Sequence, residues 1–458
     1  MASKTLIWFR QDLRVNDNPA LHQAALDGEV VAIFVEAQKQ RKQHHESSAK
    51  VGLIYDSLLE LRAALNELNI PLHIQCCDYF DDQIETIKAF VDDNGISAVY
   101  FNNEYPINEL ERDATLKSVL EGMNVEVNRF DGDLALEPNL VKNKQGDPYK
   151  VFTPYKKAWI NVHKQSPFEP LKPPEKQSYS IKEQATEDFP AEYREDLWPA
   201  GESAAYERLD KFLSKVESYK KTRDIPSVSG TSCLSPYLAI GAISAKQCMH
   251  ALLEYYDGDE EKLYGDTWFS ELVWREFYRQ VLIDNPELTK HKPFNPDAAE
   301  VWADNQEAFE AWKEGKTGFP IIDAAMRQLN QTGWMHNRLR MNAAMFLNKL
   351  CLVDWRWGEK YFMESLIDGD FASNNGGWQW CSSTGADGAP YFRIMSPLSQ
   401  SERFDPDGDF IRKLVPELKD LDKKSIHNPS SEQREKTGYP EPIINYKESR
   451  KRALELLG

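Results

Sequence analysis

The first 130 residues alternate between short apolar runs and helical patterns, and this rhythm constrains the fold more than any other feature of the chain. A buried strand followed by a covering helix, repeated along a sequence, is typical of a parallel sheet with helices on both faces. The apolar runs stand at 6–9, 30–35, 72–74, 98–101 and 125–127, and the helical patterns at about 18–26, 48–68, 80–93 and 107–121. Residues 1–130 are therefore predicted to form a doubly wound α/β domain.

The loop after the first predicted strand lacks the glycine pattern of ordinary dinucleotide-binding domains. It reads WFRQDLRVNDNPAL (8–21), so the G-x-G-x-x-G turn that lets backbone approach a pyrophosphate is missing. Residues 131–200 are rich in proline and charge and are predicted to be a connector with one helix near 155–164. From 201 to 458 we expect an all-helical domain, with helices at 203–218, 236–256, 267–285, 303–314, 319–331, 333–352 and 356–366.

The composition argues against several classes of protein. No apolar run approaches the roughly 18 residues that a membrane span needs, and the chain begins with a strand-like segment in place of a signal peptide. The six cysteines and nine histidines show no CxxC pair, HxxxH pair or other metal-ligand spacing. We therefore expect a reduced, cytoplasmic protein without a metal centre.

The net charge of −18 argues on its own against a nucleic-acid partner. Residues 313–360, however, hold eight lysines and arginines against four acids, a local charge of +4. A small positive patch on an acidic body permits weak, salt-sensitive binding to DNA. A solvated helical face would give the same pattern, so charge alone leaves both interpretations open.

Residues 368–393 read DGDFASNNGGWQWCSSTGADGAPYFR and have the composition of a binding segment. Flat aromatic faces beside amides and carboxylates suit a planar heteroaromatic ligand or a nucleobase. The pair Gly376-Gly377 lets the backbone approach a neighbour closely. Nine of the twelve tryptophans lie between 268 and 380. The working site is therefore predicted in the C-terminal half of the chain.

Three further segments combine chemically useful residues, and each also has an ordinary structural explanation. In a helix over 268–279, Glu271, Trp274 and Arg275 share one face. They form either a buried indole with a surface ion pair, or a stacking platform with a carboxyl placed over a ligand.

The segment 333–347 places Asn337 and Met341 at i and i+4, with Arg338 beside them and Arg340 on another face. A helical methionine is usually core filler, but the arginines and the asparagine are harder to explain as core.

In 230–244, the Thr-Ser run ends at Ser235 before Pro236, which predicts a helix N-cap. Helix N-termini also bind phosphate, so both explanations stand.

These residues lie within long motifs that resemble the photolyase/cryptochrome flavoproteins, and most nearly the bacterial photolyases that repair cyclobutane pyrimidine dimers. The motifs are WFRQDLR (8–14), YKVFTPYKKAW (149–159), RDIPSVSGTS (223–232), WFSELVWREFYR (268–279), EGKTGFPIIDAAMRQLNQTGWMHNRLRM (314–341), DGD…NNGGWQW (368–380) and YPEPI (439–443). The resemblance runs nearly from end to end. It implies a light-driven lyase that binds FAD in its helical domain and acts on damaged DNA.

The resemblance assigns FAD-binding residues one by one. Asp368 would pair with Arg340 and, together with Asp370, meet the isoalloxazine edge, and Asn374 would face flavin N5. The family often has a basic residue where this chain has Cys233, so one phosphate contact is lost or supplied elsewhere. The implied FAD-binding residues are Tyr219, Thr231, Ser232, Leu234, Ser235, Trp268, Glu271, Arg275, Asn337, Arg340, Asp368, Asp370 and Asn374.

The resemblance also implies how the substrate is held. Trp274 and Trp380 would form an apolar wedge against the flipped-out dimer. Met341 would touch the ring atoms, and Arg338 would meet the flanking phosphates. Glu271 would hydrogen-bond the pyrimidine where negative charge develops, a preorganised electrostatic role.

Several positions favour one branch of the family. Asn374 matches the photolyases, whereas plant-type cryptochromes carry an acid there and the animal type a cysteine. Asn337 and Met341 stand where the six-four photolyases use histidines, so they favour cyclobutane dimers. Tryptophan at both 274 and 380 fits a duplex-acting enzyme better than the DASH-type cryptochromes.

Two further groups of residues match family positions. An electron chain that reduces the flavin from the surface is implied at Trp378, Trp355 and Trp302, each of which alone would be explained as core packing. A methenyltetrahydrofolate antenna, favoured over a deazaflavin, is implied at His44, Asn108, Glu109 and Lys290. The carboxylate is the informative member, because it can bind the amino-pyrimidine edge of a pterin in a bidentate way.

We therefore expect a monomeric FAD enzyme that opens cyclobutane pyrimidine dimers by electron transfer from excited FADH⁻, with electron return and no net redox change. One alternative is a blue-light photoreceptor that signals through a partner; Asn374 and the absence of a long tail after YPEPI count against it. Another is a flavoprotein that only shuttles electrons, in which Trp274, Trp380 and Glu271 would have no purpose.

Overall fold

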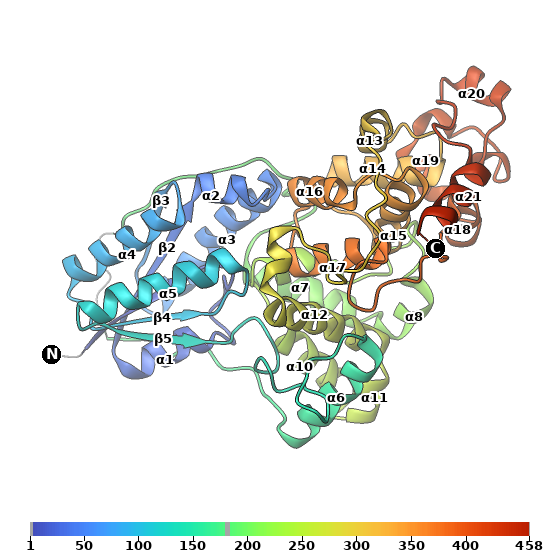
Figure 1. Ribbon diagram of the computed structural model, residues 1–458. Coiled ribbons are helices and arrows are strands. Elements are labelled where there is room, and N and C mark those ends of the chain that lie inside the picture. Colours follow the sequence, from blue (N-terminus) through green and yellow to red (C-terminus); the bar gives the residue numbers. More distant parts are fainter. Residues whose placement is uncertain (1–2, 179–183, 458) are drawn as a thin grey trace. The chain divides into compact units, whose positions relative to one another are not determined.

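The computed structural model describes residues 3–178 and 184–457, and a five-stranded parallel sheet forms its N-terminal part (Figure 1). The strands are β1 (Lys4–Phe9), β2 (Glu29–Ala37), β3 (Leu72–Cys77), β4 (Ala98–Asn102) and β5 (Glu126–Phe130). They lie in the order β3-β2-β1-β4-β5, and every neighbouring pair is parallel. The predicted doubly wound sheet is confirmed.

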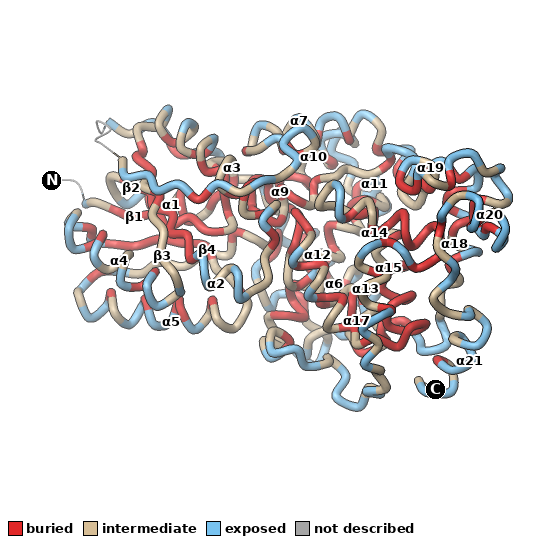
Figure 2. Tube along the Cα trace, turned by 90° about the horizontal axis from the view of Figure 1, so that it is seen from above, coloured by how far each residue is buried: buried red, intermediate tan, exposed pale blue. Residues whose placement is uncertain are grey.

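Helices cover both faces of the sheet. On one face, α4 (Phe80–Asn94) and α5 (Ile107–Gly122) share a hydrophobic core with the strands. On the other, α1 (Pro19–Asp27) is tied to β1, because Thr5 Oγ1 donates to Ala24 O at 3.0 Å. Figure 2 shows the central strands β1, β2 and β4 as buried almost throughout, which explains their continuous apolar runs, whereas the edge strands β3 and β5 are partly exposed. Between β2 and β3 the chain forms α2 (Gln38–Gln43) and α3 (Ser48–Glu67).

The chain divides into two compact units. Unit 1 contains residues 1–214 and 232–289, and unit 2 contains residues 215–231 and 290–458. Beyond the sheet, unit 1 holds the connector and the helices α6 (Phe152–Gln165), α7 (Gly201–Leu213), α9 (Ser235–Ala239), α10 (Ala245–Tyr255), α11 (Glu260–Gly265) and α12 (Thr267–Asp284). No helix within residues 3–178 and 184–457 is long and apolar enough to cross a membrane.

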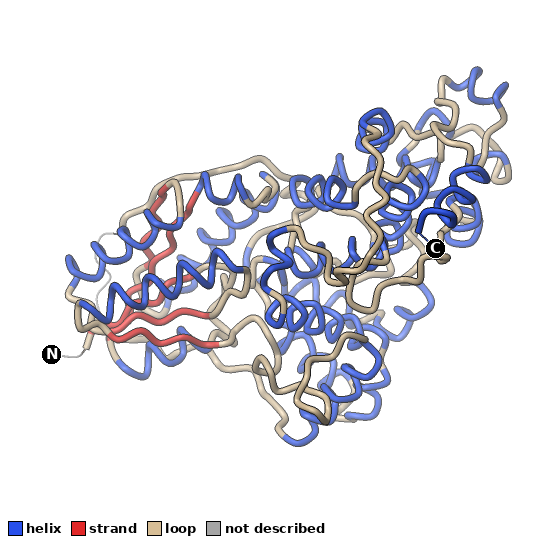
Figure 3. The backbone as a smooth tube through the Cα atoms, in the orientation of Figure 1, coloured by secondary structure: helices blue, strands red, loops and turns tan. Residues whose placement is uncertain are grey.

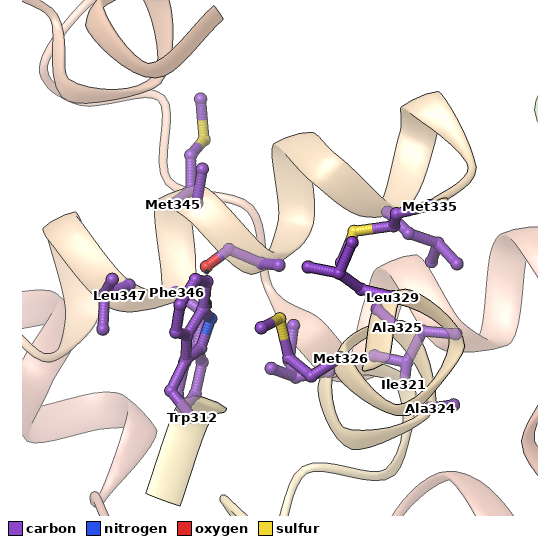
Figure 4. Packing of buried hydrophobic residues seen from close by; sticks show 14 of the residues in the cluster. Trp312, Ile321, Ala324, Ala325, Met326, Leu329, Met335, Met345, Phe346 and Leu347 are labelled. Carbon is purple, nitrogen blue, oxygen red and sulfur yellow. Dashed lines mark hydrogen bonds between the residues drawn. The ribbon is translucent and has the colours of Figure 1, made fainter. Parts of the chain in front are cut away.

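Unit 2 is built from helices, which confirms the predicted helical C-terminal part (Figure 3). Its core is one buried cluster in which Trp312, Met326 and Phe346 take part (Figure 4), and Trp312 Nε1 donates to Ala343 O at 3.1 Å. Its helices are α8 (Tyr219–Thr222), α13 (Gln306–Lys313), α14 (Pro320–Thr332), α15 (Asn337–Met345), α16 (Trp355–Ser365), α17 (Phe371–Ser382), α18 (Pro397–Phe404), α19 (Asp409–Leu414), α20 (Ser431–Thr437) and α21 (Tyr446–Leu457).

Three predicted helices differ from the structure. The helix predicted at 236–256 is two helices, α9 and α10, separated by a turn at Gly241, whose φ is +69°. The helix predicted at 333–352 begins only at Asn337 and continues as a π-helix over Phe346–Leu350. The helix predicted at 203–218 ends at 213, and a 3₁₀ turn follows at Val216–Ser218. The apolar periodicity of the sequence continues across each break, so it does not reveal where these helices begin or end.

Candidate active site

α17 carries the central part, residues 371–382, of the binding segment predicted at 368–393. Asp370 caps this helix, because its carboxylate accepts a hydrogen bond from a backbone N–H of the first turn at 2.8 Å. Asn374 donates from Nδ2 to Glu359 O at 2.9 Å. Its Oδ1 is therefore the end of the amide that can accept a hydrogen bond from a ligand.

The ion pair predicted between Arg340 and Asp368 is confirmed. Arg340 Nη2 lies 2.7 Å from Asp368 Oδ2, and Arg340 Nε donates to Met335 O at 2.8 Å. The other carboxylate oxygen, Asp368 Oδ1, is buried and has no hydrogen-bond partner among the described residues. An unsatisfied buried acceptor costs free energy unless a ligand donates to it, so this oxygen marks a ligand-binding position.

α15 begins at Asn337 with a histidine cap. His336 Nδ1 accepts from Arg338 N at 3.2 Å, and burial lowers the pKa of His336 to about 4, so the imidazole is neutral near pH 7. Arg338 donates to Asp224 Oδ1 at 2.8 Å. Met341 packs, partly buried, against the core of unit 2, so core filling accounts for part of its role.

The positive patch predicted at 313–360 is largely neutralised within unit 2. Its basic side chains contact acids or carbonyls in the pairs Lys313–Glu310, Lys316–Glu314, Arg327–Glu417, Arg338–Asp224, Arg340–Asp368, Arg356–Glu300 and Lys360–Glu364, and in the bonds from Lys349 to Pro390 O and Arg393 O. Most of these acids lie outside the 313–360 window. The local sum of charges therefore overestimates the free positive charge.

The three tryptophans predicted to carry electrons all belong to unit 2. Trp355 and Trp378 are buried, at 0% and 2% exposure, and Trp302 packs partly buried against the same core. Trp378 lies 6.0 Å from Trp312, measured between ring centroids, and presses on α16 at Gly358. A Cβ at that glycine would stand 2.1 Å from an indole carbon. Trp312 was not selected from the sequence.

The expected phosphate-binding residues divide between the two units. Tyr219 begins α8 and Thr231 ends the first segment of unit 2. In unit 1, Leu234 N donates to Ser232 Oγ at 3.4 Å, and α9 begins at Ser235. The N-cap residue is Leu234, and it makes no side-chain hydrogen bond, so the predicted Ser235 cap is wrong.

α12 carries Trp268, Glu271 and Arg275 in unit 1. Asp266 caps the helix, because its carboxylate accepts from Trp268 N at 2.6 Å. Arg275 donates from Nη1 to Asp133 O at 2.8 Å and from Nη2 to the Asp133 carboxylate. The connector therefore supplies the acid for this arginine, and the surface ion pair with Glu271 is not needed to balance its charge.

Trp274 lies half-buried on the same helix. Phe152, the first residue of α6, stacks on it with ring centroids 3.7 Å apart and planes 8° from parallel. Tyr278 stacks on it at 5.5 Å. The indole is thus held in a fixed plane, which suits a rigid stacking platform. Trp380, the other predicted platform, belongs to unit 2, where it packs partly buried against the core.

Three of the predicted antenna residues come together in unit 1. Asn108 Nδ2 lies 3.0 Å from His44 Nε2, and Glu109 Oε1 lies 3.4 Å from His44 Nδ1. Burial acts against protonation of this imidazole, but the Glu109 and Glu46 carboxylates together outweigh it and raise the pKa of His44. Glu109 Oε2 is buried without a partner in the described chain. Lys290, the fourth residue, ends the 3₁₀ turn Pro286–Lys290 and belongs to unit 2.

A buried amide network behind α17 was missed from the sequence. Asn375 Nδ2 donates to Glu359 Oε1 at 2.7 Å, and Gln379 Nε2 donates to Asn375 Oδ1 at 2.9 Å. Gln379 Oε1 accepts from Phe294 N at 2.7 Å. These bonds fix the rotation of α17 and so the direction of its other face. The i, i+4 spacing of two amides was the signal that could have revealed the network.

Comparisons with known proteins agree with this arrangement. The family model described as "DNA photolyase" matches residues 5–175, and the model described as "FAD binding domain of DNA photolyase" matches residues 268–458. An Escherichia coli protein named deoxyribodipyrimidine photo-lyase is 42% identical over 98% of this chain and 97% of its own length. A Vibrio cholerae protein of the same name is 40% identical over 98% of each chain.

A solved structure agrees with these sequence matches. The crystal structure of a bacterial class III photolyase from Agrobacterium tumefaciens superposes with a TM-score of 0.88 at 34% identity, and covers 100% of this chain and 97% of that one. Both the sequence matches and this structural match extend over nearly the full length. The chain therefore belongs to the photolyase/cryptochrome family and carries the FAD-binding domain of the DNA photolyases.

Proposed function

We propose that this chain is a deoxyribodipyrimidine photo-lyase that uses light to open cyclobutane pyrimidine dimers in DNA. The observation that carries the proposal is the match of nearly the whole chain to relatives of that name at 40% and 42% identity. Asn374, Asn337 and Met341 support it, because they are the residues implied for a photolyase of cyclobutane dimers.

Unit 2 offers a polar edge that suits a flavin. Asp368 Oδ1 and Asn374 Oδ1 are acceptors, and the ring edge and N5–H of a reduced flavin are donors. Arg340 holds the Asp368 carboxylate in place from its other oxygen at 2.7 Å. When bound, reduced and excited FAD supplies one electron to the dimer and takes it back. We assign FAD binding to Tyr219, Thr231, Ser232, Leu234, Ser235, Trp268, Glu271, Arg275, Asn337, Arg340, Asp368, Asp370 and Asn374.

The lesion would be held by stacking and by charge. A dimer must leave the duplex to be repaired, and its poor stacking lowers the cost of flipping by a few kcal/mol. Trp274, already fixed by Phe152 at 3.7 Å, would present a rigid face to it together with Trp380 and Met341. Glu271 would hydrogen-bond the pyrimidine where negative charge develops.

The buried tryptophans would serve reduction rather than repair. Trp378, Trp355 and Trp302 would pass an electron from the surface to the flavin, and the indole N–H groups of Trp355 and Trp378 have no acceptor among the described residues.

The proposal is tested with purified protein, reduced flavin and irradiated DNA. We expect dimers to disappear in blue light and to persist in a dark control. Trp274→Ala should lower dimer affinity by roughly 5- to 150-fold, since stacking on an aromatic ring contributes about 1–3 kcal/mol per base. Trp357→Phe, at a partly buried tryptophan that packs against the core of unit 2, is the control. A protein with bound flavin and intact dimers under light would favour the photoreceptor instead.

We further propose a folate antenna in unit 1, beside His44. The unpaired Glu109 Oε2 would accept from the amino-pyrimidine edge of methenyltetrahydrofolate, and Asn108 and Lys290 would complete the contacts. Glu109→Gln removes the charge and should weaken folate binding at least tenfold, read from the absorbance of the retained folate. Glu121→Gln, on the exposed end of α5, is the control. Repair should continue without folate at a lower rate per incident photon.

The protein would act as a monomer on cytoplasmic DNA. Size-exclusion chromatography with light scattering should give the mass of one 52.7 kDa chain. A stable dimer in the absence of DNA would contradict this part of the proposal.

A further inference from the structure

Residues 142–157 of unit 1, the basic arm, form a positively charged segment on an acidic chain. The arm holds five lysines and one aspartate, a local charge of +4, in a chain whose net charge is −18. A run of charge is usually only a solvated surface. Three features of the structure distinguish this segment. Its first half is an ordered turn, its second half packs on the helix that carries Trp274, and three of its lysines have no partner among the described residues.

The first half of the arm is an ordered turn. Asn143 Oδ1 accepts from Gln145 N at 2.8 Å and from Asp147 N at 2.9 Å, and Asn143 N donates to Asp147 O at 2.9 Å. Lys142 Nζ lies 3.1 Å from Asp284 at the end of α12. A turn closed by an asparagine side chain and tied at its base loses little conformational entropy on binding a ligand.

The second half of the arm is attached to the helix that carries Trp274. Phe152 stacks on Trp274 at 3.7 Å, and Tyr155 packs against Phe277 at 5.2 Å. α6, which begins within the arm, therefore runs beside α12 (Figure 1). The second half of the arm is therefore packed directly on the helix that carries Trp274.

Two of the five lysines in the basic arm contact other residues of unit 1. Lys142 pairs with Asp284, and Lys156 Nζ donates to Ser270 Oγ at 2.6 Å and to Tyr264 O at 3.2 Å. The remaining three lysines of the arm are exposed and have no hydrogen bond or ion pair with any described residue; they are Lys144, Lys150 and Lys157. The basic side chains of 313–360, by contrast, contact acids or carbonyls in unit 2.

We propose that the basic arm is a DNA-backbone contact that binds phosphates flanking the lesion on the side of Trp274. Lys144, Lys150 and Lys157 meet the phosphates without reading sequence, which is the role of lysine on a nucleic-acid backbone. The inference rests on the proposed function, because it takes damaged DNA as the partner. It adds a contact surface in unit 1 to the residues that the family resemblance implies.

The test compares two triple variants with the same change in net charge. The arm variant is Lys144→Gln, Lys150→Gln and Lys157→Gln, and the control is Lys172→Gln, Lys176→Gln and Lys211→Gln, which are exposed lysines elsewhere in unit 1. Surface changes of this kind leave the fold intact, which equal unfolding midpoints would verify. The readout is the dissociation constant for a duplex with one dimer, measured over a series of salt concentrations.

Each lost phosphate contact reduces the slope of log affinity against log salt by about 0.9. We expect the arm variant to lose about 2 to 3 units of slope and to bind undamaged duplex more weakly as well. The control should keep the wild-type slope within about half a unit. Equal slopes for the two variants would overturn the inference.

Failure of the proposed function would look different from failure of this inference. Wild-type protein that leaves dimers intact in light would refute the repair activity, whatever the salt slopes. Wild-type protein that repairs dimers, while the arm variant and the control bind alike, would refute only the role of the arm.

Discussion

At the scale of single residues, burial sets the protonation of His336 and with it part of the acid stability. Burial lowers the pKa of His336 from 6.5 to about 4, so the unfolded chain binds more protons between these values. The contribution to the free energy of unfolding is therefore present above pH 6.5 and is lost as the pH falls through 4. The size of the shift corresponds to roughly 3 kcal/mol.

His336→Asn tests this directly. Asparagine keeps a side-chain acceptor for Arg338 N, so the cap of α15 survives while the titration is removed. Between about pH 7 and about pH 4 the wild type should lose roughly 3 kcal/mol of stability relative to the variant. Urea unfolding at a series of pH values measures the difference. Two parallel profiles would show that the imidazole is already accessible to protons in the native state.

Residue pairs differ in how far they can be predicted from sequence. The pairing of Arg340 with Asp368 was predicted, because both residues stand in motifs whose family roles are linked, and it is confirmed at 2.7 Å. The contact of Arg275 with Asp133 spans 142 residues of sequence and has no local signal. The stacking of Phe152 on Trp274 has none either. Contacts of this kind follow from the packing of whole elements.

At the scale of elements, the contact between α16 and α17 leaves no room for a side chain at Gly358. A Cβ there would lie 2.1 Å and 2.5 Å from two carbons of the Trp378 indole. Gly358→Ala should therefore displace that ring and cost about 1–3 kcal/mol of stability. Because Trp378 would carry electrons toward the flavin, photoreduction of the oxidised flavin should slow by at least tenfold.

Two controls separate this effect from general damage. Repair by chemically reduced Gly358→Ala protein should stay near the wild-type rate, since the tryptophan chain is then not needed. Gly122→Ala, where a new Cβ meets no atom within 4 Å, should change neither stability nor photoreduction by a measurable amount. Wild-type photoreduction in a folded Gly358→Ala variant would exclude the assigned role of Trp378.

The type of each element was predicted better than its ends. Apolar periodicity identified the strands and most helices, because burial imposes a period of two or 3.6 on the sequence. It did not reveal the break at Gly241, where φ is +69° and a Cβ would lie 2.1 Å from Gln11 O. The π-helical turn at Phe346–Leu350 keeps its apolar residues buried, so it also leaves the apolar pattern intact.

No helix after residue 366 was predicted from the sequence, and the structure adds α17 to α21.

At the scale of the whole molecule, the number of basic side chains without an acidic partner cannot be obtained by adding the charges within a segment of sequence. The patch at 313–360 is balanced by acids from outside the window, whereas the basic arm at 142–157 keeps three exposed lysines without partners in the described chain. Sequence alone identifies both segments as +4 but does not distinguish them. The distinction needs the long-range ion pairs.

An electron that leaves the reduced flavin and returns to it would repair the dimer without a lasting change in the redox state of the flavin. Reduced protein is mixed with an equal amount of dimer-containing DNA, and the dimer content and the flavin spectrum are followed together under blue light. We predict that dimers disappear in light, persist in the dark, and leave the reduced flavin spectrum unchanged at the end. Intact dimers beside a flavin that has become oxidised would contradict the account.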